Sequence, residues 1–184
     1  ALLLFGAVQV TMIGYGLWRG ERLSAWQIAG LVSAFAGLVG LLLPGLSAPP
    51  LREALLMLVA GAAWGVYSLR GKGTQDPARV TAGNFLRSSV FAVALSAVMV
   101  SHVSLDTAGV GYAITSGALA SGVGYIIWYT ALRGLTATSA ASVQLSVPVI
   151  AAVGAIVLLN EAVTPRLFIA SVVILGGIAL VIFH

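Results

Sequence analysis

Charged residues, histidines and cysteines are scarce in this sequence. Its 184 residues include nine Lys or Arg, five Asp or Glu, two His and no Cys. Charged residues make up 8% of the chain, against roughly 25% in a typical soluble domain. Disulfide and thiolate chemistry is therefore excluded, and two isolated histidines do not predict a metal site. So little polar surface cannot cover a water-soluble fold, which excludes a soluble enzyme and a nucleic-acid-binding protein.

Hydrophobic residues instead make up 60% of the chain, and the mean hydropathy is +1.07. The charged residues divide the sequence into apolar stretches of about 20 residues, the length that crosses about 30 Å of hydrocarbon. Glycine, proline and asparagine gather at the breaks, as expected for turns. We therefore predict an all-α integral membrane protein of about seven transmembrane helices, at about 1–18, 25–43, 53–70, 83–101, 109–132, 136–159 and 166–183.

The basic residues predict how the chain is oriented, because cytoplasmic loops carry an excess of Lys and Arg. Alternate loops hold seven of the nine basic residues, namely Arg19, Arg22, Arg70, Lys72, Arg79, Arg87 and Arg133. The opposite loops hold only Arg52 and Arg166. This bias places the 19–24, 71–82 and 133–135 loops, and the C-terminus, in the cytoplasm.

An internal repeat is visible when the chain is compared with itself at an offset of 140 residues. Gly20-Glu21 then aligns with Asn160-Glu161, and Ala36-Gly37 aligns with Gly176-Gly177. Five predicted spans separate the two glutamate corners, so the corners lie on opposite faces of the membrane. This arrangement is typical of the inverted repeats of secondary transporters.

These motifs resemble the EamA-type transporters of the drug/metabolite transporter superfamily. The resemblance is carried by Gly20-Glu21-Arg22-Leu23-Ser24, Gln27, Gly30 and Gly37 in one copy, and by Gly124–Tyr129, Ala140-Ala141-Ser142, Leu145, Pro148 and Asn160-Glu161 in the other. Asn160 stands where the family pattern has glycine. The resemblance implies a ten-helix exporter or permease of metabolites, built from two inverted five-helix halves and working in a bacterial inner membrane.

On that basis the chain would be the C-terminal part of such a transporter. Residues 1–43 would be the last two helices of the first repeat, 44–52 a connecting loop, and 53–184 a complete second repeat. Three helices would then precede Ala1.

The span at 136–159 is the best candidate for a substrate site. Pro148 has no N–H and crowds the carbonyl of Gln144, four residues earlier, near the middle of the membrane. A freed carbonyl beside the Gln144 amide, flanked by Ser142 and Ser146, would form a neutral polar site. The alternative is a helix kink whose freed carbonyl is met by a neighbouring helix.

Further candidates lie on other spans. Ser121 and Tyr125 share a helix face at a spacing of four residues, and Trp64 lies about two-thirds of the way across its span. Small-residue packing and an interfacial aromatic belt are the alternative roles. Asn84 and Arg87 share a face at the predicted cytoplasmic mouth, where Arg87 alternatively extends to the interface.

We therefore predict a membrane transporter that moves a small polar or amphipathic metabolite, neutral or zwitterionic, by alternating access. The alternative is a non-transporting membrane scaffold. A retinal protein is excluded because the one lysine, Lys72, lies in a loop, and an enzyme is not expected because no acid or base lies at depth. The predicted partners are the substrate and the lipid bilayer, with no cofactor or metal; the small residues between Gly30 and Gly40 could also form a homodimer face.

Overall fold

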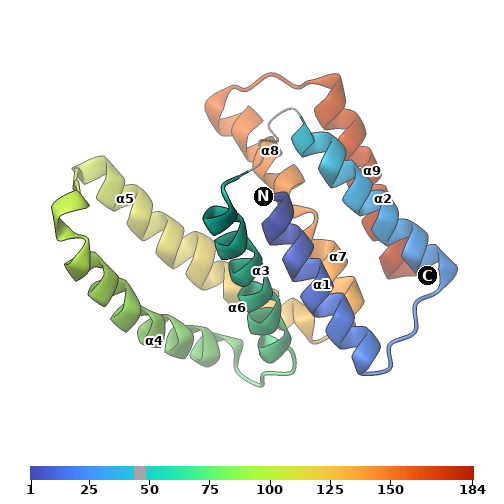
Figure 1. Ribbon diagram of the computed structural model, residues 1–184, viewed down its shortest axis with the longest axis horizontal. Coiled ribbons are helices and arrows are strands. Elements are labelled where there is room, and N and C mark those ends of the chain that lie inside the picture. Colours follow the sequence, from blue (N-terminus) through green and yellow to red (C-terminus); the bar gives the residue numbers. More distant parts are fainter. Residues whose placement is uncertain (44–48) are drawn as a thin grey trace. The chain divides into compact units, whose positions relative to one another are not determined.

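The computed structural model describes residues 1–43 and 49–184, and this part of the chain is helical with no strands (Figure 1). The elements, in chain order, are α1 (Leu2–Trp18), α2 (Ala25–Leu42), α3 (Leu51–Gly71), α4 (Pro77–Val98), η2 (Val100–His102), α5 (Thr107–Thr115), η3 (Ser116–Val123), α6 (Gly124–Leu132), α7 (Ala137–Gln144), α8 (Val147–Leu159) and α9 (Pro165–Phe183).

The seven predicted spans are confirmed as helical segments, and most of their ends agree within two residues. Two spans are composite: α5, η3 and α6 together form the fifth, and α7 and α8 form the sixth. Five of these segments are long and apolar enough to cross a membrane, and α1 is a shorter apolar helix. The segment α4 has the length but carries Arg79, Asn84 and Arg87 in its first half. Most of the predicted connecting loop, 44–48, lies outside the described residues, and α3 already begins at Leu51.

Side-chain caps explain where several helices begin. Ser24 and Gln27 form a capping box at the start of α2: the Gln27 N–H donates to the Ser24 hydroxyl at 3.1 Å, and the Ser24 N–H donates to the Gln27 side chain at 3.0 Å. Thr164 caps α9 through the Leu167 N–H. Thr164 and Leu167 lie 140 residues after Ser24 and Gln27, so the cap also follows the internal repeat.

The chain divides into two compact units, which we describe separately. One consists of Ala1–Leu69 and Leu135–His184, and the other of Arg70–Gly134. The first, called the repeat unit below, contains α1, α2, α7, α8, α9 and nearly all of α3.

Within the repeat unit, α2 and α9 lie side by side along most of their length (Figure 1). The Gln27 side chain reaches the carbonyl of Val181 and the Ser33 hydroxyl reaches that of Val173, so the two helices run antiparallel. The buried residues of α2 match those of α9 at the offset of 140: Gly30 with Ala170, Ala34 with Ile174, Gly37 with Gly177 and Leu38 with Ile178. This match supports the internal repeat.

Close backbone contact at this seam requires glycine on both helices. A Cβ on Gly30 would lie 2.5 Å from the carbonyl oxygen of Gly177, and a Cβ on Gly177 would lie 2.5 Å from that of Gly30. Small residues allow membrane helices to approach in this way. Gly30, Ala34 and Gly37 are thus buried within the chain. A homodimer stays a prediction.

Each of the two glutamate corners contains a residue with a positive φ. Gly20 has φ +90° and Asn160 has φ +54°, both in the left-handed region. Asparagine is one of the few residues besides glycine that adopt this region readily. Asn160 therefore fits the position that the family pattern gives to glycine.

We expect Gly30→Ala to destabilise the protein by about 1–3 kcal/mol, because the added methyl group collides with the Gly177 carbonyl. Gly176→Ala is the matched control, since a Cβ there meets no atom within 4 Å. Thermal unfolding followed by tryptophan fluorescence would measure both variants. Equal melting temperatures for Gly30→Ala and Gly176→Ala would contradict the packing described here.

Candidate functional site

The helix predicted to hold the site is interrupted by a two-residue turn. The first part, α7, ends at Gln144, a turn follows at Leu145 and Ser146, and α8 starts at Val147 with Pro148 in its first turn. Proline is favoured at this position because the first turn of a helix needs no N–H donor there. The turn lies directly before Pro148, where the sequence predicts a kink near the middle of the span.

Gln144 is buried at the end of α7 and contacts two other helices. Its Nε2 lies 3.2 Å from Sδ of Met12 on α1 and 3.5 Å from the hydroxyl of Ser68 on α3. The side chain is 4% exposed, and its Oε1 has no hydrogen-bond partner. One half of this amide is therefore paired and the other half is an open acceptor.

The two serines predicted to flank Gln144 use their hydroxyl protons within their own chain segment. Ser142 donates to the carbonyl of Ser139 at 2.9 Å, and Ser146 donates to that of Val143 at 2.7 Å. Ser142 is fully buried and Ser146 is half-buried. Both can still accept a hydrogen bond, but in this arrangement neither offers a donor.

Trp64 lies on the part of α3 that packs against α1. Gly61 and Gly65 flank it, and a Cβ at either glycine would collide with α1, at Leu4 and Thr11 respectively. The indole ring lies 5.9 Å from the ring of Phe5, centroid to centroid, and its Nε1 is buried without a hydrogen-bond partner. Trp64 therefore supplies an open donor within the repeat unit.

Gln9 on α1 was missed by the sequence analysis. Its Nε2 donates to the carbonyl of Ala141 on α7 at 2.7 Å, and its Oε1 is buried without a partner. Because Gln9 contacts α7 at Ala141 and Gln144 contacts α1 at Met12, the two amides hold these helices together reciprocally. An uncharged polar residue inside an otherwise apolar span was the signal that could have identified Gln9.

Unpaired polar atoms are concentrated in the repeat unit. Across residues 1–43 and 49–184, four buried side-chain atoms lack a hydrogen-bond partner: Gln9 Oε1, Trp64 Nε1, Thr81 Oγ1 and Gln144 Oε1. Three of the four belong to the repeat unit. Each such group costs about 1–3 kcal/mol if nothing meets it.

The other predicted site residues belong to the second unit. Tyr125 stands between two aromatic rings, 6.3 Å from Phe85 and 6.1 Å from Tyr129. Nη1 of Arg87 donates to Oδ1 of Asn84 at 3.4 Å, so these two residues do lie together as their spacing suggested.

Ser121 lies in η3, a π-helical segment that the sequence analysis did not foresee. The assumption of a continuous α-helix over 109–132 was therefore wrong. A π-helical turn takes in more residues than an α-helical turn, so the face predicted from α-helical spacing does not run unchanged through it. Glycines at 117, 122 and 124 lie in or beside the segment.

A corner glutamate joins the α1–α2 connection to the start of α7. One carboxylate oxygen of Glu21 accepts the Ala137 N–H at 2.7 Å, and the other accepts the Thr138 N–H at 3.1 Å and the Thr138 hydroxyl at 2.9 Å. A carboxylate is favoured here because it meets unpaired N–H groups at the positive end of the helix dipole. Glu21 thus caps a helix that begins 116 residues later in the chain.

The family of the chain follows from comparison with known proteins. The sequence profile of the EamA-like transporter family matches residues 51–183. The chain belongs to this family. As a member of the EamA-like transporter family it is a multi-pass membrane protein, which agrees with its apolar helices.

Two relatives match almost all of the chain. An uncharacterized protein of Pseudomonas aeruginosa, PA1977, is 57% identical over 182 residues, covering 99% of this chain and 63% of that protein. An uncharacterized transporter of Archaeoglobus fulgidus is 29% identical over 187 residues, covering 97% of this chain and 62% of that protein. The chain therefore spans less than two thirds of the length of both relatives.

A solved crystal structure shares the fold. It matches with a TM-score of 0.78 at 23% identity, covering 98% of this chain and 64% of that one. At this level of identity the match speaks for the helical arrangement alone.

We expect Glu21→Ala to lower the stability of the EamA-like fold by about 2–3 kcal/mol, because two backbone N–H groups and one hydroxyl lose a charged acceptor. Glu161→Ala, at the exposed equivalent corner, is the matched control and should unfold within about 1 °C of the unmodified protein. Differential scanning calorimetry of the purified protein would measure the melting temperatures of both variants. An unchanged melting temperature for Glu21→Ala would refute the capping role.

Proposed function

We propose that this EamA-like chain forms the larger part of an alternating-access carrier for small polar or amphipathic metabolites. The observation that carries the proposal is the open acceptor of Gln144, buried at the break between α7 and α8. The transporter family match supports the general class, and the substrate and mechanism are our proposal.

Hydrocarbon offers no hydrogen bonds, so an unpaired amide at this depth favours a site that another molecule completes. The Gln144 oxygen accepts and the Trp64 indole donates, both from the repeat unit. A solute with both kinds of group, such as an alcohol, an amide or a zwitterion, meets both requirements. We further propose that Ser142 and Ser146 contribute to this site. From the sequence pattern alone, we also propose Ser121 and Tyr125 as substrate-binding residues and Asn84 and Arg87 as residues of a cytoplasmic mouth.

Charge argues against a strongly ionic substrate. The buried polar side chains around the break are amides and hydroxyls, with an indole beside them. An isolated ion at such a site would lose its hydration without gaining a counter-charge, which is costly. Neutral and zwitterionic solutes fit better.

The break itself supports alternating access. At Leu145–Ser146 the backbone N–H groups bond to carbonyls three residues earlier instead of four, and we propose this turn as the point where the helix bends. Discontinuous helices at the midplane are a recurring feature of transporters. The π-helical η3 is a second irregular segment, of a kind frequently found at functional sites.

Orientation and coupling complete the proposal. The distribution of Arg and Lys favours a cytoplasmic C-terminus in a bacterial inner membrane. Proton-coupled carriers usually hold an ionisable group within the membrane. Because no acid or base lies at depth in the predicted spans, we propose that the carrier is either facilitative or coupled through a residue outside them.

The proposal is tested by substrate counterflow into liposomes with the full-length natural protein. The panel contains amino acids, organic cations, nucleotide sugars and drug-like cations. We expect one neutral or zwitterionic class to be exchanged, and Gln144→Leu to reduce the rate about tenfold, because the open acceptor is lost. Gln75→Leu, the same change at an exposed loop residue, is the control and should leave the rate unchanged.

Counterflow of no compound by folded, correctly oriented protein would overturn the proposal in favour of a membrane scaffold. Equal rates for Gln144→Leu and Gln75→Leu would leave transport standing but remove Gln144 from the site.

A second test uses the absence of native cysteines. We expect Gln144→Cys and Tyr125→Cys to react with a membrane-impermeant thiol reagent from at least one side, because an alternating-access path exposes them to water. Gln75→Cys in an exposed loop is the reactive control, and Val8→Cys, at a position with 0% exposure, is the unreactive one. Protection of residues 144 and 125 from both sides would contradict a water-filled path at this place.

A further inference from the structure

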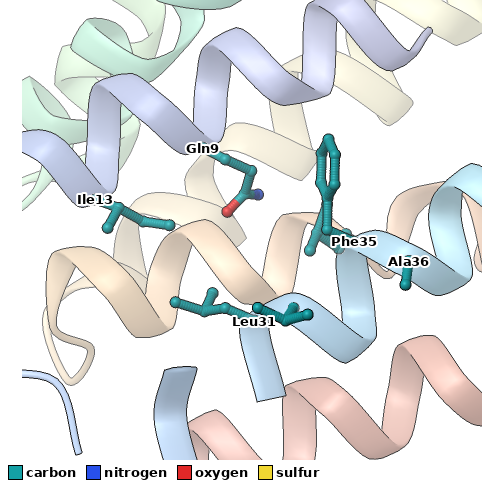
Figure 2. A pocket seen from close by; sticks show the side chains of 7 residues that line it. Gln9, Ile13, Leu31, Phe35 and Ala36 are labelled. Carbon is teal, nitrogen blue, oxygen red and sulfur yellow. The ribbon is translucent and has the colours of Figure 1, made fainter. Parts of the chain in front are cut away.

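The positive charge of the chain is concentrated in the second unit, Arg70–Gly134. This unit holds five of the nine basic residues, and four of the five lie where α3 and α6 end and α4 begins. These four residues, called the basic cluster below, are Arg70, Lys72, Arg79 and Arg133. By contrast, the apolar groove beside Gln9 in the repeat unit is lined without any charged side chain (Figure 2). An anionic partner therefore finds its counter-charge at the basic cluster and not in that groove.

Packing within the second unit brings the ends of α3 and α6 together. Tyr129 of α6 lies against Gly71, the last residue of α3, and a Cβ on Gly71 would collide with its ring. Arg133 directly follows α6, and its Nη2 donates to the backbone carbonyl of Gln75 at 2.9 Å. Gln75 belongs to the loop between α3 and α4, which also carries Lys72. Arg133 is thus held against this loop, although 58 residues separate it from Gln75 in the sequence.

The charge of the basic cluster is largely uncancelled. Arg133 donates to a neutral carbonyl, which orients the guanidinium but leaves its charge and most of its N–H groups available. Asp76 is the one acidic residue between Arg70 and Arg79, and its Oδ1 accepts the backbone N–H of Arg79 at 2.9 Å as the cap of α4. Arg70, Arg79 and Arg133 are exposed, and Lys72 is half-buried. Four basic residues and one acidic residue give these segments a formal charge of +3.

The basic cluster lies at the level of the lipid headgroups. The membrane-length segment Leu51–Gly71 ends beside Lys72, and the segment Thr107–Leu132 ends beside Arg133. Residues that directly follow such a segment lie at the membrane interface. The bias of Lys and Arg towards one side of a membrane explains why each loop is basic, but it does not require residues of two loops to meet. The contact between Arg133 and Gln75 shows that here they do meet.

We propose that the basic cluster binds the headgroup of an anionic phospholipid, with the Arg133 guanidinium donating to the phosphate. A guanidinium presents its N–H groups in a planar fork that matches phosphate oxygens. Arg70, Lys72 and Arg79 add attraction, as basic residues near an anionic membrane surface do. The acyl chains of the lipid stay in the bilayer beside α3 and α6. This inference concerns the second unit and holds whether or not the chain transports a solute.

The test is native mass spectrometry of the full-length natural protein in detergent. The protein is titrated with phosphatidylglycerol and with phosphatidylcholine of identical acyl chains, which differ in the net charge of the headgroup. We expect phosphatidylglycerol to bind at least about tenfold more tightly, because four basic residues attract one anion. The preference should shrink as the concentration of ammonium acetate is raised.

Three variants locate the site. Arg133→Gln should weaken the binding of phosphatidylglycerol about fivefold and leave that of phosphatidylcholine unchanged, and Lys72→Gln should act in the same direction. Arg52→Gln is the matched control, because it removes the same charge from an exposed position at the opposite end of α3. It should change neither affinity.

Equal affinity of the unmodified protein for the two lipids would overturn the proposal. Equal losses for Arg133→Gln and Arg52→Gln would overturn it too, since the preference would then reflect net charge alone. Glycerol phosphate, the soluble part of the headgroup, should not displace the lipid at equal concentration; displacement would show a site for soluble anions instead. If Arg133→Gln does not fold, the comparison of the two lipids and of Lys72→Gln with Arg52→Gln still decides the matter.

Discussion

Hydrocarbon cannot form hydrogen bonds, and the arrangement of the repeat unit depends on this constraint. A polar group within a span must find its partner in the chain, in a bound molecule or in trapped water. The α1–α7 contact meets the demand in two places: Gln9 donates to the Ala141 carbonyl, and the Glu21 carboxylate accepts the first N–H groups of α7. The start of α7 and the Gln9 amide thus both find their hydrogen-bond partners in distant segments of the chain. These contacts define how α1 and α7 lie against each other.

The inverted repeat adds a second constraint, because the equivalent helices of the two copies, α2 and α9, pack antiparallel against each other. Gly30 and Gly177 exchange close contacts with each other's carbonyl oxygens at the α2–α9 seam. The copies differ where their surroundings differ. α1 runs without interruption through Val8, whereas the equivalent Pro148 follows a break between α7 and α8. The seam therefore preserves the shared geometry, and the turn beside Gln144 departs from it.

Much of the fold was readable from the sequence, because span length, turn residues and caps are local properties. The repeat was readable too, since the same local pattern recurs 140 residues later. The unforeseen features depend on contacts between distant segments or on backbone irregularity. The partner of Glu21 lies 116 residues away and that of Gln9 lies 132 away. The π-helical η3 has no distinctive composition beyond its small residues, which fit close packing equally well.

In the side-chain amides of Gln9 and Gln144, the nitrogen contacts a neighbouring helix and the oxygen stays open. The Nε2 of Gln9 contacts Ala141, and the Nε2 of Gln144 contacts Met12 and Ser68. In both side chains the Oε1 has no hydrogen-bond partner. Packing between the helices accounts for the paired nitrogens but not for the two open oxygens. Half-paired amides become favourable once something with a donor group arrives. Because the nitrogen is already held by the neighbouring helix, the direction of the oxygen is fixed before a ligand binds. Binding then does not carry the entropic cost of ordering the amide.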